Sequence, residues 1–411
     1  MIVKPYIKEF EKFGFGLFVH FGAYSVLSKG EWAKDHYGIP YEEYDRYVRE
    51  FCPKETWAEE LVAAAKNAGC RYITLTTRHH DGFSLYDTCG LNAYDTLHTC
   101  GRDLVREFVA ACRNGGVIPF FYHTLLDWHD ERYQTDFPAY LAYLRKSVEL
   151  LCLNYGKIGG LWFDGWWDKK EADWEEDALY ATIRRYQPEA MIINNTGMIH
   201  RGKTGHIELD SVTFERGKPT PINRAGAPKY LASEMCETLN SHWGYAKMDL
   251  HYQSVAQIIE TLCDCRRYGS NLLLNVGPKP DGSLRTMDLA LLEAVGQWVS
   301  LFGEAIRSPR PYLTALEGRE KDFVLKDGKN YYLFAFSLGM VGNPNVALRH
   351  SMEDSACDRF SIGSDRIVRA VWLDTGSNAT FEQQDGRVIF RTEPFSYGND
   401  LVGRVAKIEC E

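Results

Sequence analysis

The sequence predicts an irregular (β/α)8-like TIM barrel followed by a small C-terminal antiparallel β-sandwich. Short apolar runs alternate with helical patterns over most of the chain, as expected for parallel strands joined by helices. After Pro309-Arg310-Pro311 the pattern changes to short alternating strands separated by Gly, Asp and Asn turns. Polar residues recur where the apolar runs of the first part end. We therefore expect a catalytic domain over residues 1–308 and a β-sandwich domain over residues 309–411.

Eight runs have the length and composition of buried strands, because they are short and rich in β-branched or aromatic residues. These strands are expected at residues 15–22, 71–77, 117–124, 158–163, 190–195, 211–215, 230–236 and 271–277. The fifth, sixth and seventh strands are too close in sequence for full helices between them, so we expect an irregular barrel there. A doubly wound open sheet is the alternative, but no Gly-rich phosphate loop follows the first strand.

Helical periodicity with matching end signals separates most of these strands. For example, Gly69 follows the first such segment and Asp103 caps the second. Helices are expected over residues 57–68, 103–114, 137–155, 175–186, 254–268 and 289–302. In the C-terminal part, strands are expected at residues 330–336, 369–373 and 386–390.

The composition indicates an ordinary globular protein, with 45% hydrophobic and 25% charged residues among 411. A net charge of −9 without a dense Lys/Arg cluster argues against a nucleic-acid partner. The N-terminal residues lack the pattern of a secretion signal, and no run of about 18 apolar residues predicts a membrane span. The 11 cysteines have no metal-binding spacing, so we expect free thiols and a cytoplasmic location.

A single carboxylate stands at the end of the fourth expected strand. Asp164 directly follows the apolar run and precedes Gly165, Trp166 and Trp167. Parallel α/β proteins place their chemistry at the carboxyl ends of strands, and tryptophan rings cover the C–H faces of sugars. The alternative is that Asp164 caps the following helix.

Almost every expected strand ends in a group that can hydrogen-bond a hydroxyl, and in a barrel these ends share one mouth. The groups are His20, His79, His80, Tyr122, His123, Asp164, Asn194, Glu215, Glu234 and Asn275. Three chemistries fit such a mouth: glycoside hydrolysis by paired carboxylates, metal-assisted hydrolysis, and sugar binding without catalysis. A zinc ion would use His79, His80 and Asp164, but adjacent histidines on a strand point to opposite faces.

Six motifs occur in order along the expected barrel. They are Gly16-Leu17-Phe18-Val19-His20-Phe21-Gly22 with Gly30-Glu31-Trp32, Arg78-His79-His80-Asp81-Gly82-Phe83, Phe121-Tyr122-His123-Thr124-Leu125-Leu126-Asp127-Trp128, Trp162-Phe163-Asp164-Gly165, Ser241-His242-Trp243-Gly244-Tyr245 and Asn271-Leu272-Leu273-Leu274-Asn275-Val276-Gly277-Pro278. Together they resemble the α-L-fucosidases of glycoside hydrolase family 29. The resemblance implies a retaining mechanism, no metal or cofactor, and a fucosylated oligosaccharide or glycoconjugate as substrate.

The resemblance also implies roles for individual residues. Asp164 is expected as the nucleophile, and the acid/base is expected at Glu215 with Glu234 as the alternative. Binding of the sugar is expected from His20, Glu31, Trp32, His79, His80, Tyr122, His123 and Trp243. The chain departs from the family pattern at Asn194-Asn195, where an aspartate and an arginine are frequent, and at His123, where tyrosine is frequent.

Overall fold

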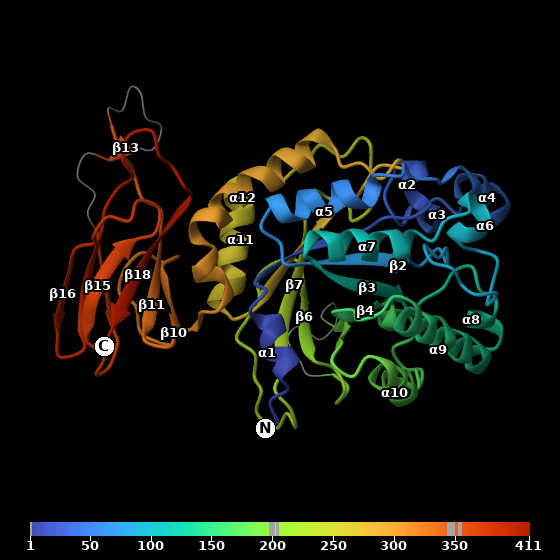
Figure 1. Ribbon diagram of the computed structural model, residues 1–411, viewed down its shortest axis with the longest axis horizontal. Coiled ribbons are helices and arrows are strands. Elements are labelled where there is room, and N and C mark those ends of the chain that lie inside the picture. Colours follow the sequence, from blue (N-terminus) through green and yellow to red (C-terminus); the bar gives the residue numbers. More distant parts are fainter. Residues whose placement is uncertain (1, 197–201, 203–204, 343–349, 352–355) are drawn as a thin grey trace. The chain divides into compact units, whose positions relative to one another are not determined.

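The computed structural model describes residues 2–196, 202, 205–342, 350–351 and 356–411 (Figure 1). Its contacts group into two compact units. The first contains Met1–Gln253 and Ser270–Glu293, and the second contains Ser254–Gly269 and Ala294–Glu411. The domain boundary at residue 308 stays a prediction.

The first unit contains the nearly closed barrel of eight parallel strands that the sequence predicts (Figure 1). The strands are β1 (Phe15–Val19), β2 (Tyr72–Arg78), β3 (Ile118–Thr124), β4 (Gly160–Asp164), β5 (Met191–Asn194), β6 (Ser211–Glu215), β7 (Ala232–Thr238) and β8 (Asn271–Val276). They are hydrogen-bonded in the order β5-β4-β3-β2-β1-β8-β7-β6. No α-helix separates β5, β6 and β7 among the described residues, in line with the expected irregularity.

Alternate side chains of these strands fill the interior of the barrel, because successive residues of a strand face opposite sides. The interior cluster includes Phe18, Tyr72, Phe120, Trp162 and Ile193, each at most 2% exposed. Strand β1 carries glycine at Gly16, which pairs with Tyr72 of β2. A Cβ at Gly16 would lie 2.4 Å from ring atoms of Tyr72, so this position leaves space that the tyrosine occupies.

Strands β5 and β6 are the two ends of the sheet order, and they meet at a seam. Asp210 connects the two strands there. Asp210 is fully buried directly before β6, and its backbone N–H donates to the Ile192 carbonyl at 2.8 Å. Its carboxylate accepts from the Ile192 N–H at 2.9 Å, from Arg184 at 2.5 Å, and from Lys229 at 2.8 Å. A buried charge with this many donors is satisfied, so the side chain stabilises the closure.

The helices include all six that the sequence predicts, with ends that differ by at most five residues. They are α1 (Pro5–Glu11), α2 (Tyr24–Leu27), α3 (Ala33–His36), α4 (Tyr41–Glu50), α5 (Trp57–Asn67), α6 (Thr96–Cys100), α7 (Leu104–Gly115), α8 (Arg132–Thr135), α9 (Phe137–Asn154), the 3-10 turn η1 (Trp166–Lys169), α10 (Glu176–Tyr186), α11 (Val255–Arg267) and α12 (Thr286–Arg307). The sequence did not predict α1, α2, α3, α4, α6 or α8. The main reason for α4 is that only Tyr44 and Val48 of its ten residues are buried, which leaves little apolar periodicity.

The second unit contains the predicted antiparallel sandwich. Its strands are β9 (Arg310–Pro311), β10 (Phe323–Asp327), β11 (Asn330–Phe336), β12 (Met340–Val341), β13 (His350–Ser351), β14 (Ala356–Ser361), β15 (Ile367–Trp372), β16 (Phe381–Gln384), β17 (Arg387–Thr392) and β18 (Gly403–Cys410). A five-stranded sheet, β15-β18-β11-β10-β9, and a three-stranded sheet, β14-β17-β16, share one core that includes Tyr331, Trp372 and Phe390.

Helix α12 is long and apolar enough to cross a membrane by length and composition. In its most apolar window, 56% of the helix is buried inside the structure, and core helices of soluble proteins meet the same criterion. This feature is weak evidence for a span, and the expected absence of a membrane partner stays a prediction.

We expect Asp210→Ala to destabilise the first unit by about 3 kcal/mol, because it removes the buried carboxylate that accepts from the Ile192 N–H and pairs with Arg184 and Lys229. Denaturant unfolding followed by fluorescence measures the loss. The control is Glu189→Ala, which breaks an ion pair with Lys157 between largely exposed side chains and should leave the midpoint unchanged. Equal midpoints for Asp210→Ala and the native chain would contradict the role of Asp210 at the seam.

Candidate active site

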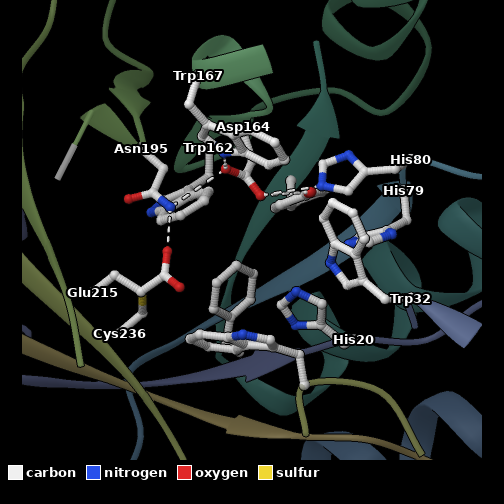
Figure 2. Close-up of a pocket in the computed structure, with 13 residues that line it drawn as sticks. His20, Trp32, His79, His80, Trp162, Asp164, Trp167, Asn195, Glu215 and Cys236 are labelled. Carbon is white, nitrogen blue, oxygen red and sulfur yellow. Dashed lines mark hydrogen bonds and ion pairs between the residues drawn. The ribbon is translucent and has the colours of Figure 1, made fainter. Parts of the chain in front are cut away.

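A cavity of about 330 Å³ opens at the carboxyl ends of the barrel strands (Figure 2). Parallel barrels place their functional groups at this end. Most of the residues expected at the site line it. The lining consists of Phe18, His20, Trp32, His79, His80, Tyr122, Trp162, Asp164, Trp167, Asn195, Glu215, Cys236 and Trp243.

Asp164 lies in the wall of this cavity at the end of β4, with 15% of its side chain exposed. Three donors point at its carboxylate. The Tyr122 hydroxyl donates to Oδ2 at 3.1 Å, the Trp167 indole N–H donates to Oδ1 at 3.2 Å, and the Asn195 amide donates to Oδ1 at 3.3 Å. These bonds hold the carboxylate facing the cavity. Asp164 caps no helix through its side chain, so the capping alternative is wrong.

Asn195 joins Asp164 to a second carboxylate, Glu215, at the end of β6 (Figure 2). The same Nδ2 atom donates to Glu215 Oε2 at 2.6 Å and to Asp164 Oδ1 at 3.3 Å. The sum of these two distances, 5.9 Å, is the largest separation that the two oxygens can have. Two carboxyl groups therefore face one small volume from different strands.

Glu215 is the carboxyl group of this pair that binds its proton more tightly than usual. Burial raises its pKa to about 7, and the negative charge of Asp164 contributes to the increase. The hydrogen bond from Asn195 and the charge of Arg216 oppose it. Near neutral pH Glu215 is thus present in both protonated and ionised forms, which suits a group that exchanges protons.

Glu234 lies deeper in the barrel and is not among the residues that line the cavity. It is 1% exposed, accepts a hydrogen bond from the Trp162 indole at 2.9 Å, and accepts another from the Tyr72 hydroxyl. Burial raises its pKa to about 7, and both hydrogen bonds oppose the increase. Its carboxyl group is occupied by two aromatic donors of the interior.

His20, His79 and His80 all face the cavity. The expectation that adjacent histidines point to opposite faces is wrong for His79 and His80. Strand β2 ends at Arg78 with an irregularity of register, so the strand alternation no longer applies to the two histidines, whose ring centroids are 4.2 Å apart. Burial lowers the pKa of all three imidazoles, that of His20 to about 3. Burial therefore favours the neutral form of each ring at neutral pH.

Aromatic rings cover the remaining wall and the rim. Trp32 is 37% exposed and stacks on Trp167 with a centroid distance of 5.9 Å. Trp243 lies beside His20, with centroids 5.1 Å apart. Flat apolar rings next to neutral imidazoles suit a ligand that has both C–H faces and hydroxyls. Of the two tryptophans that follow Asp164, Trp167 lines the cavity and Trp166 does not.

Two residues expected to bind the ligand lie outside the cavity lining. Glu31 is 6% exposed, and its carboxylate accepts from the Gly244 N–H at 2.7 Å, so it joins its own loop to the loop after β7. His123 is fully buried, with Nδ1 2.7 Å from the Thr124 carbonyl and Nε2 3.3 Å from the Tyr86 hydroxyl. Direct binding by Glu31 or His123 stays a prediction.

The sequence analysis named Asn194 at the end of the fifth strand and missed the role of Asn195. The side chain of Asn194 donates to the Tyr180 hydroxyl at 3.0 Å, on the helix side of the strand. All four residues of β5 are buried, so the sequence alone does not show that Met191 and Ile193 face inward and that Asn195 follows them on the same side. The cavity also includes Phe18, Trp162 and Cys236, which the sequence analysis did not single out as ligand-binding residues.

The absence of a metal or cofactor stays a prediction. Within the part of the chain that the structure describes, no three His, Cys, Asp or Glu side chains are arranged to hold a metal ion.

Comparisons with known proteins agree with this geometry. The sequence model of the alpha-L-fucosidase family matches residues 3–304. Tissue alpha-L-fucosidase of Mus musculus is 30% identical over 399 residues, covering 88% of this chain and 84% of the mouse protein. Alpha-L-fucosidase isoenzyme 1 from Paenibacillus thiaminolyticus superposes with a TM-score of 0.81 at 28% identity, covering 99% of both chains. A GH29 alpha-L-fucosidase from Bacteroides thetaiotaomicron, solved as a trapped covalent intermediate, has a TM-score of 0.81 at 20% identity and covers 99% of this chain and 96% of its own.

We expect Asp164→Asn to lower the pKa of Glu215, because the substitution removes a neighbouring negative charge that raises it. Titration of 13C-labelled glutamate carboxyl groups by NMR measures the change. Glu234 is an internal control, since Asp164 is not among the causes of its shifted pKa. An unchanged Glu215, or an equal change in both glutamates, would contradict direct coupling between Asp164 and Glu215.

Proposed function

The chain belongs to the alpha-L-fucosidase family of glycoside hydrolases, and we propose that it is a retaining exo-α-L-fucosidase. In this proposal it removes terminal α-L-fucosyl residues from fucosylated oligosaccharides or glycoconjugates. The reaction proceeds through a covalent glycosyl–enzyme intermediate, the species trapped in the Bacteroides thetaiotaomicron relative.

One observation supports the retaining mechanism above all: a single amide nitrogen bonds to both Asp164 and Glu215. Retaining glycosidases hold their two carboxyl groups about 5–5.5 Å apart, whereas inverting enzymes need about 6.5–9.5 Å to admit a water molecule. The upper limit of 5.9 Å on the bridged oxygens agrees with the shorter range.

The roles follow from the environments of the two groups. Asp164 attacks the anomeric carbon from the face opposite the leaving group, while Glu215 transfers its proton to the departing glycosidic oxygen. The bond from that carbon to the leaving oxygen breaks as the bond to Asp164 forms. Glu215, now ionised, takes a proton from water, which attacks the same carbon and releases fucose with its original α configuration.

Glu215 is preferred over Glu234 as the acid/base because it lines the cavity beside Asp164. Glu234 has a pKa raised to a similar value, but its two oxygens accept bonds from Tyr72 and Trp162. An acid must come within hydrogen-bond reach of the leaving oxygen, so geometry decides between two groups of similar pKa.

The neutral histidines and the aromatic rings support a deoxysugar ligand. His20, His79 and His80 offer nitrogen atoms to hydroxyls, and Trp32, Trp167 and Trp243 offer apolar faces to C–H groups and the methyl substituent. A cytoplasmic location is also part of the proposal, and all 11 cysteines as free thiols are consistent with it.

Azide distinguishes the two carboxylates by the product that it forms. With Asp164→Ala, azide replaces the missing nucleophile and attacks from its face, so we expect β-fucosyl azide from 4-nitrophenyl α-L-fucoside. With Glu215→Ala, the covalent intermediate still forms from this activated substrate, and azide attacks from the other face to give α-fucosyl azide. Proton NMR of the product measures the configuration.

Glu234→Gln is the matched control and should give no azide product. Natural glycans have poor leaving groups, so Glu215→Ala should lose about 10²–10⁴ in rate on them while it retains much of its activity on the nitrophenyl substrate. If Glu234→Gln gives α-fucosyl azide and Glu215→Ala does not, the acid/base is Glu234.

The pH profile gives a further test. Hydrolysis of natural glycans requires protonated Glu215, so activity should fall as pH rises through about 7. Asn195→Ala removes a hydrogen bond that lowers this pKa, and the alkaline limb of kcat/KM should therefore move to higher pH. A limb that stays in place in Asn195→Ala would contradict the assignment to Glu215.

A further inference from the structure

Two of the histidines that face the cavity make hydrogen bonds that determine which ring nitrogen carries the proton. For His80, Nδ1 lies 2.7 Å from the Thr124 hydroxyl oxygen. The Thr124 hydroxyl has one hydrogen, and it donates this hydrogen to the Leu126 carbonyl. A carbonyl only accepts, so the hydroxyl oxygen must accept from His80 Nδ1.

His20 is held in the same way from the other side of the cavity. Its Nδ1 lies 2.6 Å from Asn275 Oδ1, and Asn275 Nδ2 donates to the Trp243 carbonyl at 2.7 Å. Because that carbonyl can only accept, the amide oxygen of Asn275 must face His20. The proton of a neutral His20 therefore lies on Nδ1.

From these contacts we propose that Thr124 and Asn275 are positioning residues that fix His80 and His20 as hydrogen-bond acceptors toward the sugar. Each imidazole carries its proton on Nδ1, away from the ligand, and presents the lone pair of Nε2 to the cavity. The sugar hydroxyls that contact His20 and His80 must then act as donors. The identity of the ligand in this inference rests on the proposed function. The protonation of His20 and His80 on Nδ1 does not depend on that function.

Two close backbone approaches keep the accepting carbonyls in place. Gly165, with φ at +92°, leaves room for Leu126, because a Cβ at Gly165 would lie 2.6 Å from the Leu126 Cβ. A Cβ at Gly277 would lie 2.9 Å from the Trp243 carbonyl oxygen. The glycines that follow Asp164 and β8 therefore allow the loops to reach Thr124 and Asn275.

The main rival is a doubly protonated His80. Its Nε2 is 3.6 Å from Asp164 Oδ2, so an imidazolium could pair with that carboxylate. Burial opposes this form and lowers the pKa of His80, although the charge of Asp164 acts in the other direction. In the proposed neutral form of His80, Nε2 carries no proton, whereas in the imidazolium Nε2 is protonated. The protonation of Nε2 can be observed directly.

Nitrogen NMR of the 15N-histidine-labelled protein tests the inference without substrate. We expect both rings at neutral pH to have a protonated Nδ1 and an unprotonated Nε2, with His20→Gln and His80→Gln spectra providing the assignments. A protonated Nε2 on His80, whether as the other tautomer or as imidazolium, would overturn the proposal for Thr124. The same result on His20 would overturn it for Asn275.

Variants at Thr124 test whether its hydroxyl determines which nitrogen of His80 carries the proton. In Thr124→Val the partner of Nδ1 is lost, so we expect the His80 proton to move to Nε2 and KM for 4-nitrophenyl α-L-fucoside to rise about tenfold or more. Thr124→Ser keeps the hydroxyl and should retain both the tautomer and the KM. If Thr124→Val is folded and keeps the Nδ1 proton, or if Thr124→Ser behaves like Thr124→Val, the proposal is wrong.

Methyl α-L-fucoside, with each hydroxyl replaced in turn by fluorine or hydrogen, tests the ligand side in the native chain. Fluorine accepts weakly and cannot donate, so at the hydroxyls that contact His20 and His80 the fluoro compound should bind as poorly as the deoxy compound. Calorimetry that shows parent-like affinity for every fluoro compound would overturn the acceptor assignment. If the parent compound does not bind although the NMR result holds, the proposed function fails and the protonation inference stands.

Discussion

The alternation of side chains along parallel strands is the constraint on which this site depends. Strands in register place their inward residues in shared layers, and Asp164 pairs with Thr124, while Glu215 pairs with Cys236. The Asn195 side chain bonds to both Asp164 and Glu215, so the two carboxylates lie at the same end of the barrel. Glu234 precedes Cys236 by two residues and so faces inward one layer deeper, where aromatic donors surround it. Glu215 pairs with Cys236 of β7, and Glu234 lies two residues earlier on that strand. This difference of two residues leaves Glu215 accessible and Glu234 buried.

Much of this arrangement could be predicted from the sequence, because apolar runs show where strands end. Which of two adjacent polar residues faces inward is harder to predict, since it depends on the register of the strand. Tyr122 faces the cavity and His123 does not, while Asn195 faces it and Asn194 does not. At β2 the register shifts near Arg78, which no pattern in the sequence indicates. The composition of a run shows where a strand ends, whereas the direction of its side chains depends on how the strand pairs with its neighbours.

The two glutamates show why a shifted pKa alone does not identify a catalytic acid. Burial is the largest cause for both, and both values rise to about 7. For Glu215 the second cause is the charge of Asp164, which acts only on a group close to it. For Glu234 the remaining causes are the hydrogen bonds from Tyr72 and Trp162. The causes of the shifts distinguish the two positions more clearly than the values do.

The seam between β5 and β6 links the closure of the barrel to its chemistry. These strands are the two ends of the hydrogen-bonded order, and polar side chains join them at both ends of the seam. Before β6, Asp210 bonds to the backbone of Ile192. At the carboxyl ends, the Asn195 amide reaches Glu215. Since Asn195 also bonds to Asp164 on β4, one side chain joins three strands and sets the spacing of two carboxylates.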